Sequence, residues 1–236
     1  MALRLPLLVR RTHKWLALIV GLQALIWTVS GMYMTAIHID VIHGDHFVRA
    51  AEPRPARAAS LMNPIWAAQA VPGAQSVKFH WLLDKPTYIV TSDGGASLVD
   101  AVTGAVLPAP SEGQIRQLAD HWFTGDEKIS GVRLIEEVPG EIRGRNPPFW
   151  RVDYNGWNKP TLYFSPATGE LLTRRHGLWR IFDFFWMTHI MDYETRDNVN
   201  NRLLIIASWA TLAMTLAGAW LLLYSFRRKR WPRSAP

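Results

Sequence analysis

Two long apolar runs without a charged residue bracket this chain, and they constrain its fold more than any other feature. The first run covers residues 15–37 and the second covers residues 203–226. At about 1.5 Å of rise per residue, each is long enough to cross a bilayer core of about 30 Å as a helix. The sequence therefore predicts a transmembrane helix in each run. Two alternatives remain: a cleaved signal peptide for the first run, or a soluble protein with two buried helices.

The charge at the two ends of the chain predicts how these helices are oriented. All 19 acidic residues lie between Asp40 and Asp197, whereas nine basic residues lie before the first run or after the second. The positive-inside rule then places both termini in the cytoplasm and residues 38–202 across the membrane. Because this basic charge sits beside apolar runs rather than on one surface, we expect lipid and no nucleic acid as its partner.

The residue types that are missing exclude several kinds of chemistry. The chain has no cysteine, which excludes disulfides, thiolate metal sites, cysteine nucleophiles and covalently attached haem. The sequence also has no nucleophile elbow, phosphate-binding loop, zinc-protease helix or paired-carboxylate site. We therefore predict no catalytic residue and no metal site, and at most a part in a membrane reductase.

A stripe of small residues runs along each apolar segment at helical spacing. Small residues allow the backbones of two helices to approach closely in lipid. These faces are expected to pack against each other or against a second copy of the chain. The members are Ala17, Gly21, Ala24, Thr28, Gly31 and Thr35 in the first run, and Ser208, Thr211, Thr215 and Gly218 in the second.

The segment between the runs contains an internal repeat. Residues 63–110 and 111–176 each begin with a helical pattern, continue with three short strand patterns, and end in Thr-Gly-x-(Val/Leu)-Leu. We predict two α-β-β-β units with antiparallel strands, in which the Thr-Gly pair closes the last hairpin because glycine accepts a positive φ. The alternative is a chance similarity between two common hairpin endings. The predicted fold class is membrane α, with two transmembrane helices, plus an α+β extramembrane part.

The remaining segments complete the predicted organisation. Residues 139–148, rich in glycine, proline and arginine, are expected to be an exposed loop, and residues 53–59 a flexible linker. The predicted segments are a basic N-terminus at 1–14, a span at 15–37, a linker at 38–62, repeat units at 63–110 and 111–176, an interfacial aromatic segment at 177–202, a span at 203–226 and a basic tail at 227–236.

Two features together resemble a known family. The paired units ending in Thr-Gly resemble PepSY domains, and residues 10–18 with 28–31 resemble the PepSY-associated transmembrane proteins of bacterial inner membranes. The resemblance implies a periplasmic PepSY pair held by membrane helices, with haem-binding ferric-siderophore reductases among the larger relatives. This chain has two spans rather than four, and Ala17 and Ser30 stand where the family pattern has Gly and Thr.

Three histidines are candidate cofactor ligands. His38 and His189 are predicted at the same membrane face, where both imidazoles could bind a haem b between the two helices. His13 is about 37 Å of helix away from His38 and would serve a site at the other face. The alternatives are a headgroup-level His13 and an amphipathic helix in which His189 only meets water.

A further polar run could hold a metal but matches no standard motif. Asp40, His43, Asp45 and His46 follow His38, and a solvated helix end is the preferred interpretation.

The sequence as a whole supports two functional hypotheses. The first is a two-span inner-membrane PepSY protein that is accessory to iron acquisition or membrane electron transfer and binds haem b. The second is a periplasmic binding or inhibitory module for a peptide, protease or receptor, acting through strand edges. Either form would work with another membrane or periplasmic protein, or as a homodimer.

Overall fold

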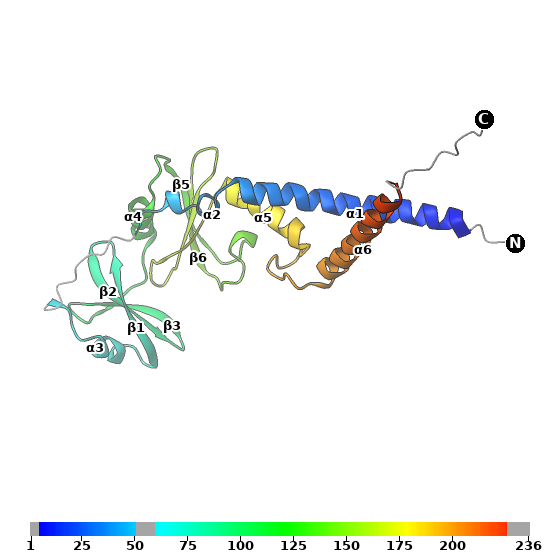
Figure 1. Cartoon of the computed structure of the whole chain (residues 1–236). Helices are drawn as coiled ribbons and strands as arrows, with labels where there is room; N and C mark the ends of the chain where they lie inside the picture. The colour runs from blue at the N-terminus through cyan, green and yellow to red at the C-terminus, as the bar shows by residue number, and fades with distance from the viewer. Residues whose placement is uncertain (1–4, 51–59, 226–236) are drawn as a thin grey trace, which may run out of the picture. The chain divides into compact units, whose positions relative to one another are not determined.

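The chain folds into two units, a helical unit and an α+β unit. The computed structural model describes the backbone of residues 5–50 and 60–225 and the side chains of residues 14–50 and 60–219. Residues up to Ile37 and from Phe182 onward form the helical unit, and His38–Ile181 form the α+β unit (Figure 1). The linker predicted at 53–59 lies outside the described residues.

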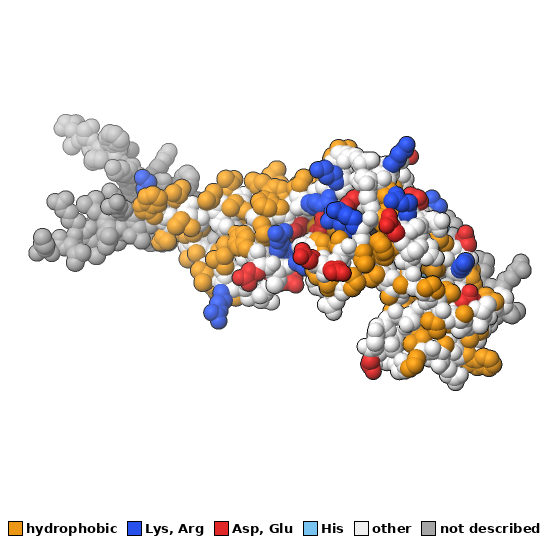
Figure 2. All heavy atoms as spheres, turned by 180° about the vertical axis from the view of Figure 1, so that it is seen from behind, with side chains coloured by type: hydrophobic (Ala, Val, Ile, Leu, Met, Phe, Trp, Pro, Cys, Tyr) orange, Lys and Arg blue, Asp and Glu red, His pale blue; other side chains and the backbone are white. Residues whose placement is uncertain are grey.

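Two helices in the helical unit are long and apolar enough to span a membrane. They are α1 (Leu5–Ala36) and α6 (Arg202–Ser225), with candidate spans at Lys14–Ala36 and Arg202–Ala219. Only 6% and 0% of the residues in these windows are buried, so neither helix is the core helix of a soluble fold. On the face that Figure 2 shows, hydrophobic side chains are numerous along the helical part of the molecule, as expected for contact with lipid.

The aromatic segment expected before the second span forms α5 (Gly177–Ile190), whose residues from Phe182 onward belong to this unit. A compact loop joins it to α6. In this loop Asp192 accepts hydrogen bonds from the backbone N–H groups of Glu194, Thr195, Asp197 and Asn198 at 3.0–3.2 Å. Hydrogen bonds from Thr195 and from these backbone groups hold the pKa of the Asp192 carboxyl well below its usual range.

The small-residue stripes are only partly used within one chain. Ala17, Ala24 and Gly31 are half-buried, whereas Gly21, Thr28 and Thr35 are exposed. On α6 only Thr211 of the predicted face is half-buried. A methyl group added at Gly21, Gly31 or Gly218 would meet nothing within 4 Å. Within one chain, therefore, only part of each small-residue stripe is buried, and the rest of each stripe is exposed.

The first repeat unit is a helix followed by an antiparallel four-stranded sheet in the order β1-β2-β3-β4. Helix α3 begins after Asn63, whose side chain accepts a hydrogen bond from Ile65 N, and Pro64 occupies its first turn. The elements are α3 (Pro64–Gln69), β1 (Ala74–Leu82), β2 (Lys85–Ser92), β3 (Gly95–Asp100) and β4 (Val106–Leu107).

The second unit repeats this plan with the sheet order β5-β6-β7-β8. Ser111 and Gln114 form a capping box that starts its helix. Gly104 and Gly169 adopt φ of +76° and +69°, as predicted for the Thr-Gly turns, and each turn leads into a fourth short strand where three were expected. The elements are α4 (Glu112–Trp122), β5 (Ile129–Ile135), the 3-10 turn η3 (Gly140–Ile142), β6 (Phe149–Tyr154), β7 (Thr161–Phe164) and β8 (Leu171–Arg175).

The main hydrophobic core is shared by both repeat units. Leu82, Ile89 and Leu98 of the first sheet pack in one cluster with residues of α4 and of the second sheet, such as Leu118 and Leu162. The other face of the first sheet packs on Ala67 of α3. Because one hydrophobic cluster contains residues of both sheets, the two repeats form one compact domain rather than two separate domains.

Part of the predicted 38–62 linker is folded onto the second repeat. It forms α2 (Ile39–His43) and the 3-10 turn η1 (Asp45–Phe47), after which Val48 pairs with Phe123 as an antiparallel bridge. Ile42 is completely buried.

The expectation of an exposed loop at 139–148 was wrong for the start of this segment. Ile142 in η3 is 2% exposed, and it packs with Phe149 and Tyr163. The prediction failed because Ile142 is a single apolar residue among the glycine and proline residues of this segment.

Candidate functional site

His189 is held by the first membrane helix. Its Nδ1 lies 2.7 Å from Ser30 Oγ, and Trp27 Nε1 donates a hydrogen bond to the His189 carbonyl at 2.8 Å. Ser30 is completely buried, and its hydroxyl donates to Ile26 O at 2.7 Å. With the Ser30 hydroxyl bonded to Ile26 O, Nδ1 of His189 can act as the donor to Ser30. The lone pair on Nε2 is then the one left for a ligand.

The other two predicted histidines lie elsewhere in the chain. His38 begins the α+β unit, whereas His189 belongs to the helical unit. The His38 side chain is 72% exposed, and its Nδ1 accepts the Asp40 N–H at 3.3 Å, which caps α2. His13 lies in α1, and its side chain is outside the described residues. Paired ligation by His38 and His189 stays a prediction.

The polar run that follows His38 does not gather into a metal site. Asp45 forms an ion pair with Arg174, and the His46 ring lies 4.1 Å from that of Phe47. Within residues 5–50 and 60–225, no group of three or more His, Asp or Glu side chains could hold a metal ion. Asp40, His43, Asp45 and His46 are all exposed, as expected for a solvated helix end.

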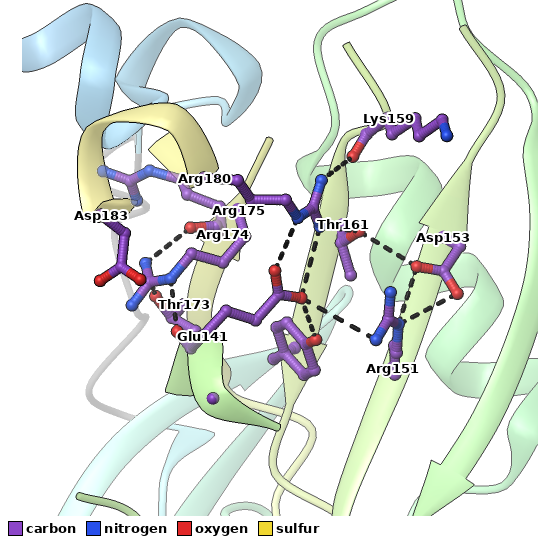
Figure 3. A network of polar contacts seen from close by, with 12 residues as sticks. Glu141, Arg151, Asp153, Lys159, Thr161, Thr173, Arg174, Arg175, Arg180 and Asp183 are labelled. Atoms are coloured by element: carbon purple, nitrogen blue, oxygen red, sulfur yellow. Dashed lines mark hydrogen bonds and ion pairs between the residues drawn. The ribbon is translucent and has the colours of Figure 1, made fainter. Parts of the chain in front are cut away.

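The face of the second sheet that points away from the main core carries a polar network centred on Glu141 and Asp153 (Figure 3). Glu141 Oε2 accepts from Arg180 Nε at 2.7 Å, and its other oxygen accepts from the Tyr163 hydroxyl. Asp153 accepts from Arg151 Nε at 2.8 Å. We call this surface the arginine-rich face. Its cations are Arg133, Arg151, Arg175 and Arg180.

Electrostatics keep the two carboxylates of this face ionised. Burial by itself would raise the pKa of Glu141, but hydrogen bonds from Arg180 and Tyr163 outweigh it and hold the pKa below its usual value. The pKa of Asp153 is lowered in the same way, against burial, by Arg151 and Arg133. Burial and the bond to Glu141 raise the pKa of Tyr163. The face therefore carries fixed charges at neutral pH, with cations in excess.

A pocket of about 490 Å³ opens on the arginine-rich face. Arg151, Lys159 and Arg180 line it together with Asp153, so cations outnumber carboxylates in its wall. The volume falls in the range of small-molecule sites, roughly 300–1,000 Å³. We call it the cationic pocket.

A second pocket, of about 550 Å³, lies where the two sheets meet. We call it the junction pocket. His80 comes from β1 and Arg174 from β8, which are edge strands of their sheets. Its main polar and aromatic lining residues are Asp45, Arg49, His80, Trp122, Glu170 and Arg174.

One ion pair and one unpartnered nitrogen distinguish the junction pocket. Lys78 Nζ lies 2.8 Å from Glu170 Oε1, which joins β1 to the turn before β8. His80 Nε2 is buried and has no hydrogen-bond partner among the described residues, and burial lowers the pKa of this histidine. The His80 ring is therefore neutral at pH 7, with one buried ring nitrogen that has no partner among the described residues.

Comparisons with known proteins add no assignment to this geometry. No protein-family model, curated protein or solved structure matches the chain. The pockets and side-chain contacts therefore carry the functional argument.

Sequence reasoning missed most of the residues that line these pockets. A usable signal was present in β6, where Arg151 and Asp153 alternate with the apolar Trp150, Val152 and Tyr154. Such alternation places the two charges on one face of a strand. Nothing in the sequence linked that face to Glu141, which comes from the segment expected to be a loop.

Proposed function

We propose that the chain is a two-span protein of the bacterial inner membrane whose α+β unit is a periplasmic PepSY-like tandem. In this proposal the unit is an interaction module that binds an extended segment of a partner protein. Two exposed apolar helices of spanning length support the membrane anchor. The basic ends of the chain support cytoplasmic termini.

The observation that carries the binding function is the junction pocket between two edge strands. An edge strand offers backbone N–H and C=O groups to an added peptide strand. Here β1 and β8 are edges of separate sheets and line one pocket. Arg49 and Arg174 lie with Asp45 and Glu170 in the wall, so both charge signs are present. This composition suits a peptide that carries charges of both signs around an apolar side chain.

A peptide-display selection on the full chain in lipid nanodiscs tests this function. The wild-type chain should enrich a consensus that contains an apolar residue flanked by charges. Arg49→Glu reverses one charge in the pocket wall without removing a core residue, and it should weaken binding of the consensus peptide about tenfold. The control is Arg116→Glu on the exposed side of α4, which should bind as the wild type does. No enriched consensus, or equal binding by both variants, would contradict the function.

Haem b binding is a second candidate, favoured by the contact between Ser30 and His189. A ligating histidine usually donates its other ring N–H to a fixed acceptor, and Ser30 is such an acceptor at 2.7 Å. His189 would therefore be one residue that holds the haem, and His38 is the second proposed ligand. Haem b would supply one-electron chemistry, consistent with an accessory role in iron acquisition or membrane electron transfer.

Absorption spectra of the purified chain, expressed with added haem, test this candidate. Two imidazole ligands should give a low-spin b-type spectrum. His189→Ala and His38→Ala should each abolish it, whereas His121→Ala on α4 should leave it unchanged. A colourless wild-type chain would rule out haem and leave the interaction module standing.

A further inference from the structure

The hairpin loop between β6 and β7 exposes a tryptophan beside a lysine. Trp157 is 83% exposed, more than any other large hydrophobic side chain found exposed among the described residues. Lys159 follows two positions later and is also exposed. A fully exposed tryptophan next to a cation is unfavourable in bulk water, but it is typical of a membrane interface, where the indole ring sits at headgroup level.

This loop is attached to the helix that continues into the helical unit. The Asn158 carbonyl accepts the Gly177 N–H at 2.6 Å, and its side-chain oxygen accepts the Leu178 N–H at 3.2 Å. Arg180 donates to the Lys159 carbonyl at 2.9 Å. These donors form the first turn of α5, which continues without a break into the helical unit at Phe182. The loop is therefore held by hydrogen bonds to the first turn of α5.

The cationic pocket opens at the base of the same loop. Gly156 and Lys159 of the loop line it with Arg151 and Arg180. Arg151 directs Nε to Asp153, and one of its terminal nitrogens forms a longer ion pair, at 3.9 Å, with Glu141 Oε1. Lys159 Nζ forms no hydrogen bond with another described residue, and its side chain is exposed. The Arg151 guanidinium and the exposed Lys159 ammonium, both in the pocket wall, are cations of the kind that recognise a phosphate group.

We propose that the cationic pocket binds the phosphate headgroup of an anionic phospholipid from the bilayer that anchors the chain, with Trp157 inserted at headgroup level beside it. The pocket supplies the charge complementarity and Trp157 supplies the apolar anchor. The site is separate from the junction pocket, so the two proposals can fail independently. Binding would hold the second repeat at the lipid surface and restrict how far the module moves from the membrane.

A single fluorophore on the loop tests the proposal, because the chain contains no other cysteine to label. Asn155 is exposed and lines the pocket, and Asn155→Cys in the full chain carries an environment-sensitive dye in nanodiscs. Replacing phosphatidylcholine with increasing phosphatidylglycerol should shift the dye emission to the blue and protect it from iodide quenching. A matched label at Trp66→Cys on α3, which is also exposed, should not respond.

Charge variants then locate the response. Lys159→Gln should weaken the phosphatidylglycerol dependence about fivefold, the equivalent of about 1 kcal/mol per basic residue near an anionic surface. Lys85→Gln removes the same charge from an exposed position at the start of β2 and should not change it. Trp157→Ser should reduce the protection from iodide.

Three outcomes would overturn the proposal. The first is an equal response in phosphatidylcholine alone. The second is an equal dependence on phosphatidylglycerol in Lys159→Gln and Lys85→Gln. In the third, inorganic phosphate added to phosphatidylcholine nanodiscs produces the full response, which would assign the pocket to a free anion instead of a lipid.

Discussion

His176 shows how much one buried residue decides in this chain. It is completely buried, its Nε2 lies 2.9 Å from Ile42 O, and its Nδ1 has no hydrogen-bond partner among the described residues. A side chain at Gly44 would lie 3.0 Å from its ring. His176 is the residue just before α5, and its ring contacts the segment that follows the first span. No sequence motif pointed to it, because its role depends on contacts 134 residues apart.

The position of His176 predicts a pH-dependent stability. Burial lowers its pKa, and the nearby His46 and Arg180 add to the effect. The unfolded state binds a proton near pH 6.5, whereas the folded state keeps the ring neutral to lower pH. Its contribution to the free energy of unfolding is therefore complete above about pH 6.5 and is lost as the pH falls toward the folded pKa. The thermal midpoint in detergent should drop between pH 7.5 and pH 5.5.

Variants test His176 and the partly buried His80 in this measurement. His80 has a lowered pKa for the same main reason, so His176→Gln and His80→Gln should each reduce the pH dependence of the midpoint. A wild-type slope in both variants would show that neither ring is responsible.

Glu141 is the second residue with a specific expected effect. Its side chain is 13% exposed and forms an ion pair with Arg180 at 2.7 Å. Glu141→Gln leaves that cation without its counter-charge, which should cost about 3 kcal/mol of unfolding free energy at pH 7. Glu112→Gln breaks a pair whose carboxylate is 57% exposed and should cost less than about 1 kcal/mol. Similar losses in both variants, compared by chemical denaturation, would contradict this assignment.

At the scale of the elements, the two Thr-Gly turns share a backbone conformation but have different surroundings. A methyl group at Gly169 would lie 2.8 Å from Leu118 Cδ1 and 3.1 Å from Leu82 Cδ1, both in the main core. At Gly104 it would meet only the flexible end of Met62. Both substitutions to alanine carry the strain of positive φ, but Gly169→Ala should also disturb packing. We expect its loss of unfolding free energy to exceed that of Gly104→Ala by about 1 kcal/mol or more, measured in the same denaturation series.

The sequence predicted these elements well where a local pattern decides the structure. Uncharged length revealed α1 and α6, and the repeat of strand patterns with a closing Thr-Gly pair revealed both sheets. The final strand β4 was missed because it has only two residues, too few for an alternating pattern. The final strand β8 has five residues, Leu171–Arg175, but apolar and polar residues do not alternate in it. Interior residues such as Glu141 and Ile42 were missed because their burial arises from contacts with distant segments, which propensity does not encode.

The candidate sites also differ in whether a local sequence pattern or distant contacts determine them. His189 stood out because histidine is costly beside an apolar run, and the structure added Ser30 as its partner. The junction pocket combines His80, Trp122 and Arg174 from three separate elements. No spacing rule connects them, so only the tertiary fold could bring them together.

At the scale of the whole molecule, the charge of the two ends predicts the topology. An alkaline-phosphatase fusion within residues 53–59 should be active, because this enzyme folds only outside the cytoplasm, and a fusion after Pro236 should be inactive. Green fluorescent protein at the same positions should give the complementary pattern. The positive-inside rule is the physical basis of this expectation. Active phosphatase at the C-terminus would reverse the assigned orientation.

The core shared by the two repeats has a consequence for the order in which the chain is made. Leu82, Ile89 and Leu98 are synthesised before α4 and the second sheet, which complete the cluster around them. Until those later residues emerge, one side of the first sheet stays uncovered and open to unwanted association. The nascent chain is thus most vulnerable at half length, and mutations that slow formation of the second repeat should show first as aggregation of the first.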